Sequence, residues 1–237
     1  MSTGRKILNL AKKRIGDTYS FGVMVPKDNP DWTGPWDCAE FASWCVYQVS
    51  GRLYGTNNND GAPAAADAYT GFWKRDAEAM GTIITVDDAA RTPGAAVLRI
   101  PHHGQRIGHI VFSDGNGGTV EAKSTNEGVV RDTLTHRRWD MGIIVPGISY
   151  TVNNEKVDYD EPSIIYRNTV PMMAGAVVKE IQHALNDAGV HPGPVDGFFG
   201  PMTERAVISF QRQEGLMVDG EVGPQTAQAL GVDLRDA

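Results

Sequence analysis

Trp-Asp-Cys-Ala-Glu-Phe-Ala-Ser-Trp-Cys-Val-Tyr-Gln, residues 36–48, is the stretch around which the rest of the chain is organised. A Gly-Pro pair at positions 34 and 35 interrupts the chain just before it. Apolar residues then recur at helical spacing, at Phe41, Ala42, Cys45 and Val49. This pattern predicts a helix that begins at Asp37 or Cys38 and ends near residues 50–51.

The position of Cys38 at a helix start matters for its chemistry. The first N–H groups of a helix and the positive end of its dipole stabilise a thiolate, which is the nucleophilic form of cysteine. The alternative is a small buried thiol without a chemical role. We favour a catalytic Cys38, because candidate partner residues follow later in the chain.

Length and composition describe an ordinary globular protein of one large or two modest domains: 237 residues, 41% of them hydrophobic and 22% charged. No run of 18 apolar residues is present, so no membrane span is expected. Residues 1–150 are neutral overall, whereas residues 151–237 hold 6 basic and 13 acidic residues and carry the whole net charge of −7. A chain without a basic face is not expected to bind nucleic acid.

The N-terminal part of the chain changes its periodicity near residue 93. Helices are predicted at residues 7–15 and 64–80, and strands at residues 94–100, 108–113, 119–124 and 140–145. Residues 114–118, Asp-Gly-Asn-Gly-Gly, have the composition of a hairpin turn. Helices followed by an antiparallel meander indicate an α+β domain.

The C-terminal part contains an internal repeat. After a predicted helix at residues 177–188, the segment 195–203 (Val-Asp-Gly-Phe-Phe-Gly-Pro-Met-Thr) recurs at 218–226 as Val-Asp-Gly-Glu-Val-Gly-Pro-Gln-Thr. Each copy has an Asp-Gly turn, then a proline suited to the first position of a helix. The predicted organisation is therefore a domain at residues 1–147, a linker at 148–172 and a small all-α three-helix domain at 173–237.

A base and an acid that could serve Cys38 lie in consecutive predicted strands. His109 and Glu121 are polar residues in otherwise apolar surroundings. If the numbers of paired residues in this hairpin sum to 230, the side chains of His109 and Glu121 are directly opposite each other. If the numbers sum to 232, these side chains are diagonal neighbours. Either register places them on one face within about 5 to 8 Å, whereas an odd sum would separate them.

Other interpretations of these residues remain open at this stage. His109 and Glu121 could form a salt bridge on a solvated sheet face. His102 and His103 could join His109 in a metal site, but the spacings typical of zinc are absent and no metal or other cofactor is expected. Cys38 and Cys45 would lie roughly 10 Å apart along one helix, too far for a disulfide.

Four segments together resemble the NlpC-type papain-like cell-wall peptidases, in the same order along residues 5–147. They are Gly-Asp-Thr-Tyr-Ser-Phe-Gly at 16–22, Asp-Cys-Ala-Glu-Phe at 37–41, Gly-His-Ile-Val-Phe at 108–112 and Val-Glu-Ala at 120–122. The doubled C-terminal motif closely resembles the three-helix peptidoglycan-binding module appended to many wall hydrolases. The alternative for this module is a generic helical oligomerisation domain.

The resemblance implies an α+β papain-like fold and a role for each matched residue. Cys38 would be the nucleophile, His109 the base and Glu121 the orienting third member, with Tyr19 and Asp37 binding the stem peptide. Two departures are present. Ala39-Glu40 replaces the usual Ser-Gly, and Glu121 stands where the family usually has histidine.

The expected function is hydrolysis of an amide bond in the peptidoglycan stem peptide, between D-Glu and the diamino acid in most of the family. The alternatives are a papain-like acyltransferase or lipase, and a wall-binding protein without catalysis. The N-terminus lacks the apolar segment of a signal peptide. We therefore expect a protein that is made in the cytoplasm and reaches the wall by another route. We also expect it to be a monomer. It would act as a phage lysin with a holin partner, as an antibacterial effector with a secretion system and an immunity protein, or as an enzyme that remodels the wall of its own cell.

Overall fold

The computed structural model describes residues 2–101, 108–153 and 164–234. These residues form two compact units. The first holds the described residues within 2–100, 108–134 and 139–153, and the second holds residues 101, 135–138 and 164–234. Each unit has its own hydrophobic core.

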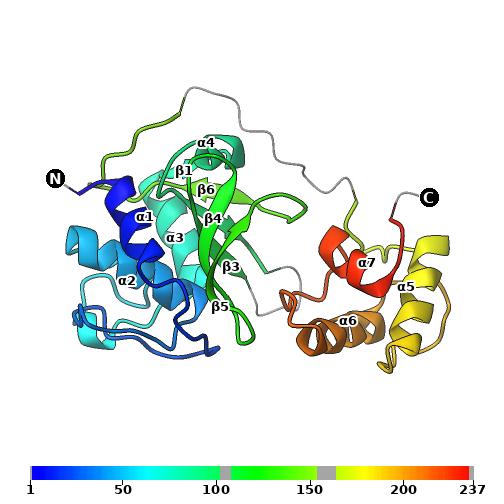
Figure 1. Cartoon of the computed structure of the whole chain (residues 1–237). Helices are drawn as coiled ribbons and strands as arrows, with labels where there is room; N and C mark the ends of the chain where they lie inside the picture. Colours follow the sequence, from blue (N-terminus) through cyan, green and yellow to red (C-terminus); the bar gives the residue numbers. More distant parts are fainter. Residues whose placement is uncertain (1, 102–107, 154–163, 235–237) are drawn as a thin grey trace. The chain divides into compact units, whose positions relative to one another are not determined.

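An antiparallel six-stranded sheet forms the centre of the first unit, in the order β1-β6-β2-β3-β4-β5 (Figure 1). The sequence predicted four of these strands and missed β1 and β5. Neither has a continuous apolar run: β1 has two residues and β5 reads Gly-Val-Val-Arg-Asp-Thr. The strands are β1 (Ile83–Ile84), β2 (Ala96–Arg99), β3 (His109–Ser113), β4 (Gly118–Ser124), β5 (Gly128–Thr133) and β6 (Met141–Ile143).

The helices of the first unit are α1 (Gly4–Lys12), α2 (Cys38–Ser50), the 3-10 turn η1 (Pro63–Ala65), α3 (Thr70–Met80) and α4 (Val86–Ala90). The predicted bounds of α2 are confirmed. Helix α1 begins and ends about three residues earlier than predicted, because Thr3 caps it by accepting a hydrogen bond from the Lys6 N–H. The predicted helix at 64–80 forms only from Thr70, since Ala68 pairs with Thr56 in an extended bridge.

The two faces of the sheet pack against different helices. Side chains at even positions, such as Ile110 and Phe112, share a core with α1 and α2, where the rings of Phe41 and Phe112 lie 6.4 Å apart. Side chains at odd positions, such as Val97 and Val111, pack with the alanines of α4. The alternation of a strand therefore decides which side chains face the α2 side of the sheet.

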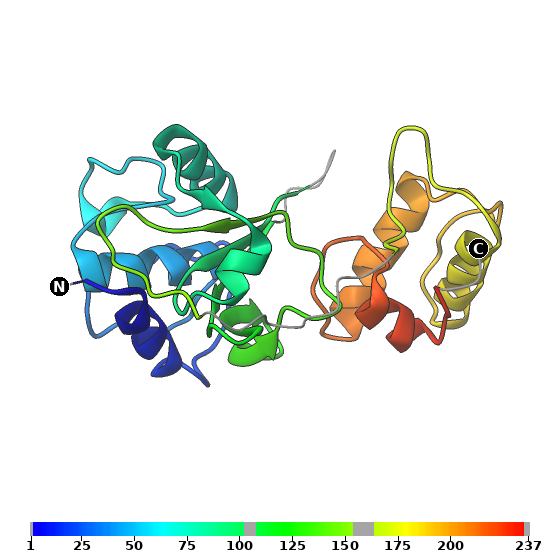
Figure 2. The ribbon, with the colours of Figure 1, turned by 90° about the horizontal axis from the view of Figure 1, so that it is seen from above.

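The second unit consists of α5 (Ala176–Asp187), α6 (Pro201–Gln213) and α7 (Pro224–Leu230), joined by loops (Figure 2). The sequence repeat is also a structural repeat, built on buried glutamines. The Gln182 side-chain amide donates to Asp196 Oδ1 at 3.0 Å and to Thr203 Oγ1 at 3.1 Å. In the second copy, Gln211 makes the same bonds to Asp219 at 2.6 Å and to Thr226 at 3.1 Å.

Each buried glutamine also accepts a bond from the Asp-Gly turn. The Gly197 N–H donates to Gln182 Oε1 at 2.9 Å, and the Gly220 N–H donates to Gln211 Oε1 at 2.8 Å. A single amide thus holds the turn and the following helix of each copy together. The predicted α+β domain followed by a small all-α three-helix domain is confirmed.

The proposed boundaries of the linker remain a prediction. Tyr166, which falls inside the predicted linker, forms a bridge with Val222 and is buried in the core of the second unit.

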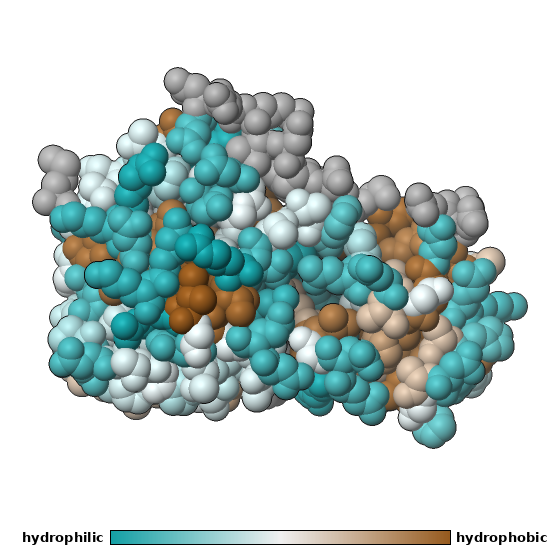
Figure 3. Space-filling model, in the orientation of Figure 1, coloured by the Kyte–Doolittle hydropathy of each residue, from teal (hydrophilic) through white to brown (hydrophobic). Residues whose placement is uncertain are grey.

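The second unit has apolar side chains on its surface. Phe198 and Met202 are 51% and 50% exposed. The face of this unit seen in Figure 3 likewise shows apolar surface between hydrophilic areas.

We expect Gln211→Leu to destabilise the second unit by about 2 to 4 kcal/mol, because it leaves several buried polar groups without partners. All five tryptophans of the chain lie in the first unit, so hydrogen exchange of peptides from α5–α7 is the suitable measurement. The control is Gln213→Leu, at an exposed position of the same helix. Equal protection in both variants would show that the amide network does not stabilise the repeat.

Candidate active site

Cys38 is the first residue of α2, as the sequence predicted. Asp37 is the N-cap, and its Oδ1 accepts a hydrogen bond from the Glu40 N–H at 2.8 Å. An aspartate at the N-cap satisfies one of the unpaired N–H groups of the first turn, so the local sequence fixes where the helix begins. The Cys38 side chain is therefore held at the helix start, and Cys38 is 8% exposed.

His109 and Glu121 lie on the same sheet face and contact each other. Strands β3 and β4 pair with residue numbers that sum to 232, as in Phe112 with Val120. Of the two registers left open by the sequence, the diagonal arrangement is the one observed. His109 Nε2 lies 2.7 Å from Glu121 Oε2 inside the protein, so this contact is not the solvated surface salt bridge that was the alternative.

Strands β3 and β4 part beside this pair. Their ladder includes only Phe112–Val120 and Ser113–Thr119, and it stops before His109. The backbone N–H of Ile110, next in sequence to His109, lies close enough to the Cys38 sulfur to lower the pKa of this thiol. The start of α2 therefore lies near the start of β3, with the thiol near the backbone of the residue that follows the histidine.

The Cys38 thiol does not ionise easily by itself. Burial, followed by the Asp37 carboxylate, raises the pKa of Cys38 to about 12, against the opposing effects of the Ile110 N–H and the Arg99 charge. We expected the helix start to lower this pKa; in the structure, desolvation outweighs that effect. A thiolate at neutral pH therefore needs a neighbouring group that takes the proton.

Tyr19 and Asp37 lie next to Cys38, as the resemblance implied. Burial, followed by the negative charges of Cys38 and Asp37, raises the pKa of Tyr19 far above its ordinary value of 10.0. Burial raises the pKa of Asp37 to about 7, although the N–H groups of Glu40, Gly22 and Ala39 oppose the rise. The structure thus places Tyr19 and Asp37 beside Cys38, and it places His109 in contact with Glu121.

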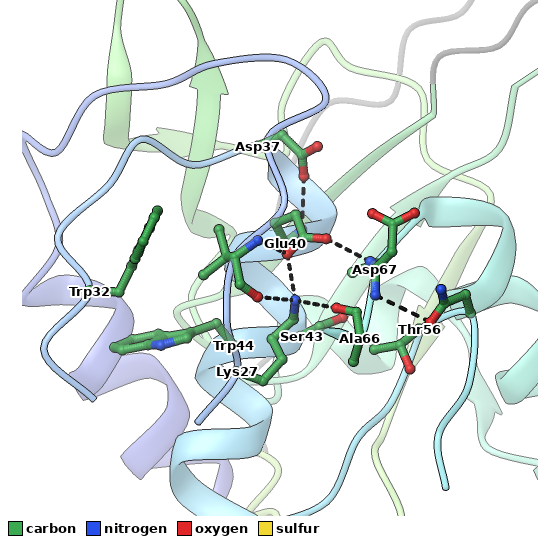
Figure 4. A network of polar contacts seen from close by, with 12 residues as sticks. Lys27, Trp32, Asp37, Glu40, Ser43, Trp44, Thr56, Ala66 and Asp67 are labelled. Carbon is green, nitrogen blue, oxygen red and sulfur yellow. Dashed lines mark hydrogen bonds and ion pairs between the residues drawn. The ribbon is translucent and has the colours of Figure 1, made fainter. Parts of the chain in front are cut away.

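Glu40, one of the two departures from the family pattern, is buried in a polar network below Asp37 in the view of Figure 4. Its Oε2 lies 2.5 Å from Lys27 Nζ and accepts the Val25 N–H at 2.8 Å. Its Oε1 accepts the Ala68 N–H at 2.6 Å. Lys27 Nζ also donates to the carbonyls of Val25 and Ala66, both at 2.8 Å. One ion pair therefore ties α2 to two loops from different parts of the chain.

The sequence analysis missed two side chains that contact the His109–Glu121 pair. The Thr119 hydroxyl donates to Glu121 Oε1 at 2.6 Å, so each carboxylate oxygen has a partner. The Trp139 ring lies 6.2 Å from the His109 ring, centroid to centroid. Thr119 could have been found from its position two residues before Glu121, on the same face of a strand. Trp139 comes from a loop and gave no such signal.

The described residues contain no group of three or more His, Cys, Asp or Glu side chains arranged to hold a metal ion. His102 and His103, considered as ligands above, lie outside the described residues. Cys38 and Cys45 are both free thiols. Among the helices that the structure describes, none combines the length and apolar character needed to cross a membrane.

Residues 174–230 match a family model described as "Putative peptidoglycan binding domain". The chain is 39% identical over 89 residues to the N-acetylmuramoyl-L-alanine amidase CwlL of Bacillus licheniformis, which covers 35% of this chain and 25% of that protein. It is 39% identical over 105 residues to the amidase CwlM of Mycobacterium tuberculosis, covering 43% and 25%. The chain therefore spans about a quarter of the length of these curated relatives.

Solved structures similar to this chain include the NlpC/p60 domain of the peptidoglycan hydrolase SagA. It shares 22% identity and a TM-score of 0.42, and covers 60% of this chain and 99% of that one. The peptidoglycan hydrolase RipB of Mycobacterium tuberculosis shares 18% identity and a TM-score of 0.42, covering 60% and 63%. The family match of residues 174–230 agrees with the resemblance of the C-terminal motifs to a peptidoglycan-binding module.

We expect Lys27→Met to lower the free energy of unfolding of the first unit by about 3 to 5 kcal/mol, because it leaves the Glu40 carboxylate buried without its cation. Tryptophan fluorescence in denaturant measures this unit. Lys74→Met is the matched control, since Lys74 pairs with Glu78 on an exposed face of α3; it should change stability by less than about 1 kcal/mol. Similar losses in both variants would contradict the role of the buried pair.

Asp37 gives a prediction for pH dependence. Its folded-state pKa of about 7 lies above the ordinary value of 3.8, so the folded state holds the proton more tightly than the unfolded state. The stability that this group contributes is therefore complete below pH 4 and is lost as the pH rises to about 7.

Asp37→Asn keeps an oxygen for the helix cap and removes the titration. We expect the stability of the wild type relative to Asp37→Asn to fall between pH 4 and 7 and to stay level above that range, measured by denaturant unfolding at each pH. Asp31→Asn, at an exposed position, is the control. A difference between wild type and Asp37→Asn that does not change with pH would mean that Asp37 has the same pKa in the folded and unfolded states.

Proposed function

We propose that this protein is a peptidoglycan hydrolase in which Cys38 cleaves an amide bond of the stem peptide. The single observation that carries the proposal is the constellation at the start of α2: Cys38 next to the backbone of β3, and His109 in contact with Glu121. The match of residues 174–230 to a peptidoglycan-binding family supports the choice of substrate.

The proposed first step is a proton transfer from Cys38 to His109. Glu121 accepts the Nε2–H of His109, which leaves Nδ1 of the ring to take the proton of the thiol. The carboxylate stabilises the imidazolium that results. Because burial raises the pKa of Cys38 to about 12, an ion pair formed with His109 is the favourable route to the thiolate.

The reaction then proceeds by acyl transfer. The Cys38 thiolate attacks the amide carbon, and N–H groups of the first turn of α2 stabilise the oxyanion. His109 gives its proton to the leaving amine, so that the amide C–N bond breaks and a thioester with Cys38 remains. His109 next takes a proton from water, the water attacks the thioester, and the thiol is restored.

Tyr19 and Asp37 border the nucleophile and would bind the stem peptide. Asp37 can pair with an amine of the substrate when it is ionised. The second unit would hold the enzyme on the insoluble wall. Its exposed apolar side chains, including Phe198 and Met202, suit contact with the apolar faces of sugar rings.

The bond that is cut has two candidates. The resemblance of the first unit names the bond between D-Glu and the diamino acid. The curated relatives CwlL and CwlM are named N-acetylmuramoyl-L-alanine amidases, which favours the bond between the glycan and the stem as the second candidate. Shortened stems attached to the glycan would identify the first bond, and release of complete stem peptides would identify the second.

The experiment is digestion of purified peptidoglycan, with either diaminopimelate or lysine as the diamino acid, followed by mass analysis of the fragments. We expect Cys38→Ala to lower the rate by about three orders of magnitude or more. Sedimentation with the wall should be unchanged, because the second unit is intact.

Cys45→Ala is the matched control, since Cys45 is a second buried cysteine on the same helix. It should retain activity. Digestion by Cys38→Ala at the wild-type rate would show that Cys38 is not the nucleophile. A wild type that binds the wall but releases no fragments would support the wall-binding alternative and contradict the proposal.

A further inference from the structure

Arg99 lies directly opposite His109 in the sheet. Strands β2 and β3 pair Arg99 with His109, so the two side chains leave the sheet on the same face about 5 Å apart at their bases. Arg99 is 2% exposed. In the sequence it is one polar residue in an apolar strand, and it carried no prediction. A guanidinium is protonated at all pH values that proteins tolerate, so Arg99 brings a fixed positive charge inside the protein.

The group formed by Cys38, His109 and Glu121 carries an unbalanced negative charge in its proposed reactive form. In its reactive form the proposed site holds a Cys38 thiolate, a His109 imidazolium and a Glu121 carboxylate, which together carry one negative charge. These three side chains are nearly or fully buried, at 8%, 4% and 0% exposure. An uncompensated charge in such surroundings is unfavourable, because desolvation is not repaid by a partner.

We propose that Arg99 supplies the fixed positive charge that balances the Glu121 carboxylate within the buried Cys38–His109–Glu121 group. The proposal rests on the function proposed above and adds a fourth member to the same site. Arg99 is a charge-compensating residue and takes no proton and no bond from the substrate. With it, the reactive form of the group is neutral overall.

The other charged groups around Cys38 are consistent with this role of Arg99. Asp37 at the N-cap raises the pKa of Cys38, and Arg99 lowers it. Tyr19 approaches from the loop before α2. Glu40, the other acid at the start of α2, is turned away and bonded to Lys27. Asp140 is exposed and accepts the Ile100 N–H. Arg99 is a cation whose protonation does not change over the pH range in which Cys38 would be assayed.

Removal of a fixed positive charge raises the pKa of every neighbouring group that titrates. We therefore expect Arg99→Met to shift the pH profile of Cys38 alkylation upward by about one pH unit, which is about tenfold slower alkylation at a pH below the midpoint. Iodoacetamide modification of the Cys38 peptide, measured by mass spectrometry, reads this directly. Arg99→Lys keeps the charge and should stay close to the wild-type profile.

Two controls separate this role from packing. Arg91→Met removes an arginine paired with Asp88 at the end of α4, away from Cys38 in sequence and partner, and should leave the profile unchanged. If Arg99→Met does not fold, the double variant Arg99→Met/Glu121→Gln removes both charges and should regain the native fluorescence and circular dichroism. A purely structural role predicts that the double variant folds no better than the single one.

The alkylation assay needs no substrate, so it tests Arg99 independently of the hydrolysis. A shift in Arg99→Met but not in Arg99→Lys supports the proposal even if the wall is not cleaved. Superimposable profiles for the wild type and Arg99→Met would overturn it, as would an equal shift in Arg99→Lys, because the effect would then not depend on the charge.

Discussion

The architecture around Cys38 depends on the carboxylate of Glu40 and the ammonium of Lys27, which meet with no exposure to solvent. Every other partner in this network is a backbone group: the N–H of Val25 and Ala68 and the carbonyls of Val25 and Ala66. A charge inside a protein must be matched by a partner and by hydrogen bonds. The pair therefore specifies where two loops are held against α2, and one of those loops follows Tyr19 directly.

The requirement that a buried charge has a partner also applies at the candidate active site. Glu121 is satisfied by His109 and Thr119, and the Cys38 sulfur lies against the amide of Ile110 because β3 and β4 part there. Asp37 caps the helix and also raises the pKa of the thiol beside it. The group can therefore hold a thiolate only together with cations, which is why the positions of His109 and Arg99 matter.

The repeat in the second unit is built around neutral side-chain amides, whereas the network beside Cys38 is built around an ion pair. Gln182 and Gln211 each bond a turn aspartate, a turn glycine and a helix threonine through one side chain. A neutral amide loses less hydration on burial than an ion does, and it can donate and accept at once. Two copies of one buried amide thus build a module with a small core.

The sequence by itself determined the features that depend on neighbours in the chain. The bounds of α2 follow from Asp37 and Gly51, and the repeat follows from its two Gly-Pro motifs. His109 and Glu121 both have odd residue numbers, which placed their side chains on one face of the predicted hairpin. Tertiary structure decided the register of β3 and β4, in which the numbers of paired residues sum to 232, and the pairing of Arg99 with His109. It also decided the burial of Glu40 against Lys27 and the packing of Trp139 against His109. Each of these joins residues distant in sequence, and pairing and desolvation at such distances leave no periodic trace in the chain.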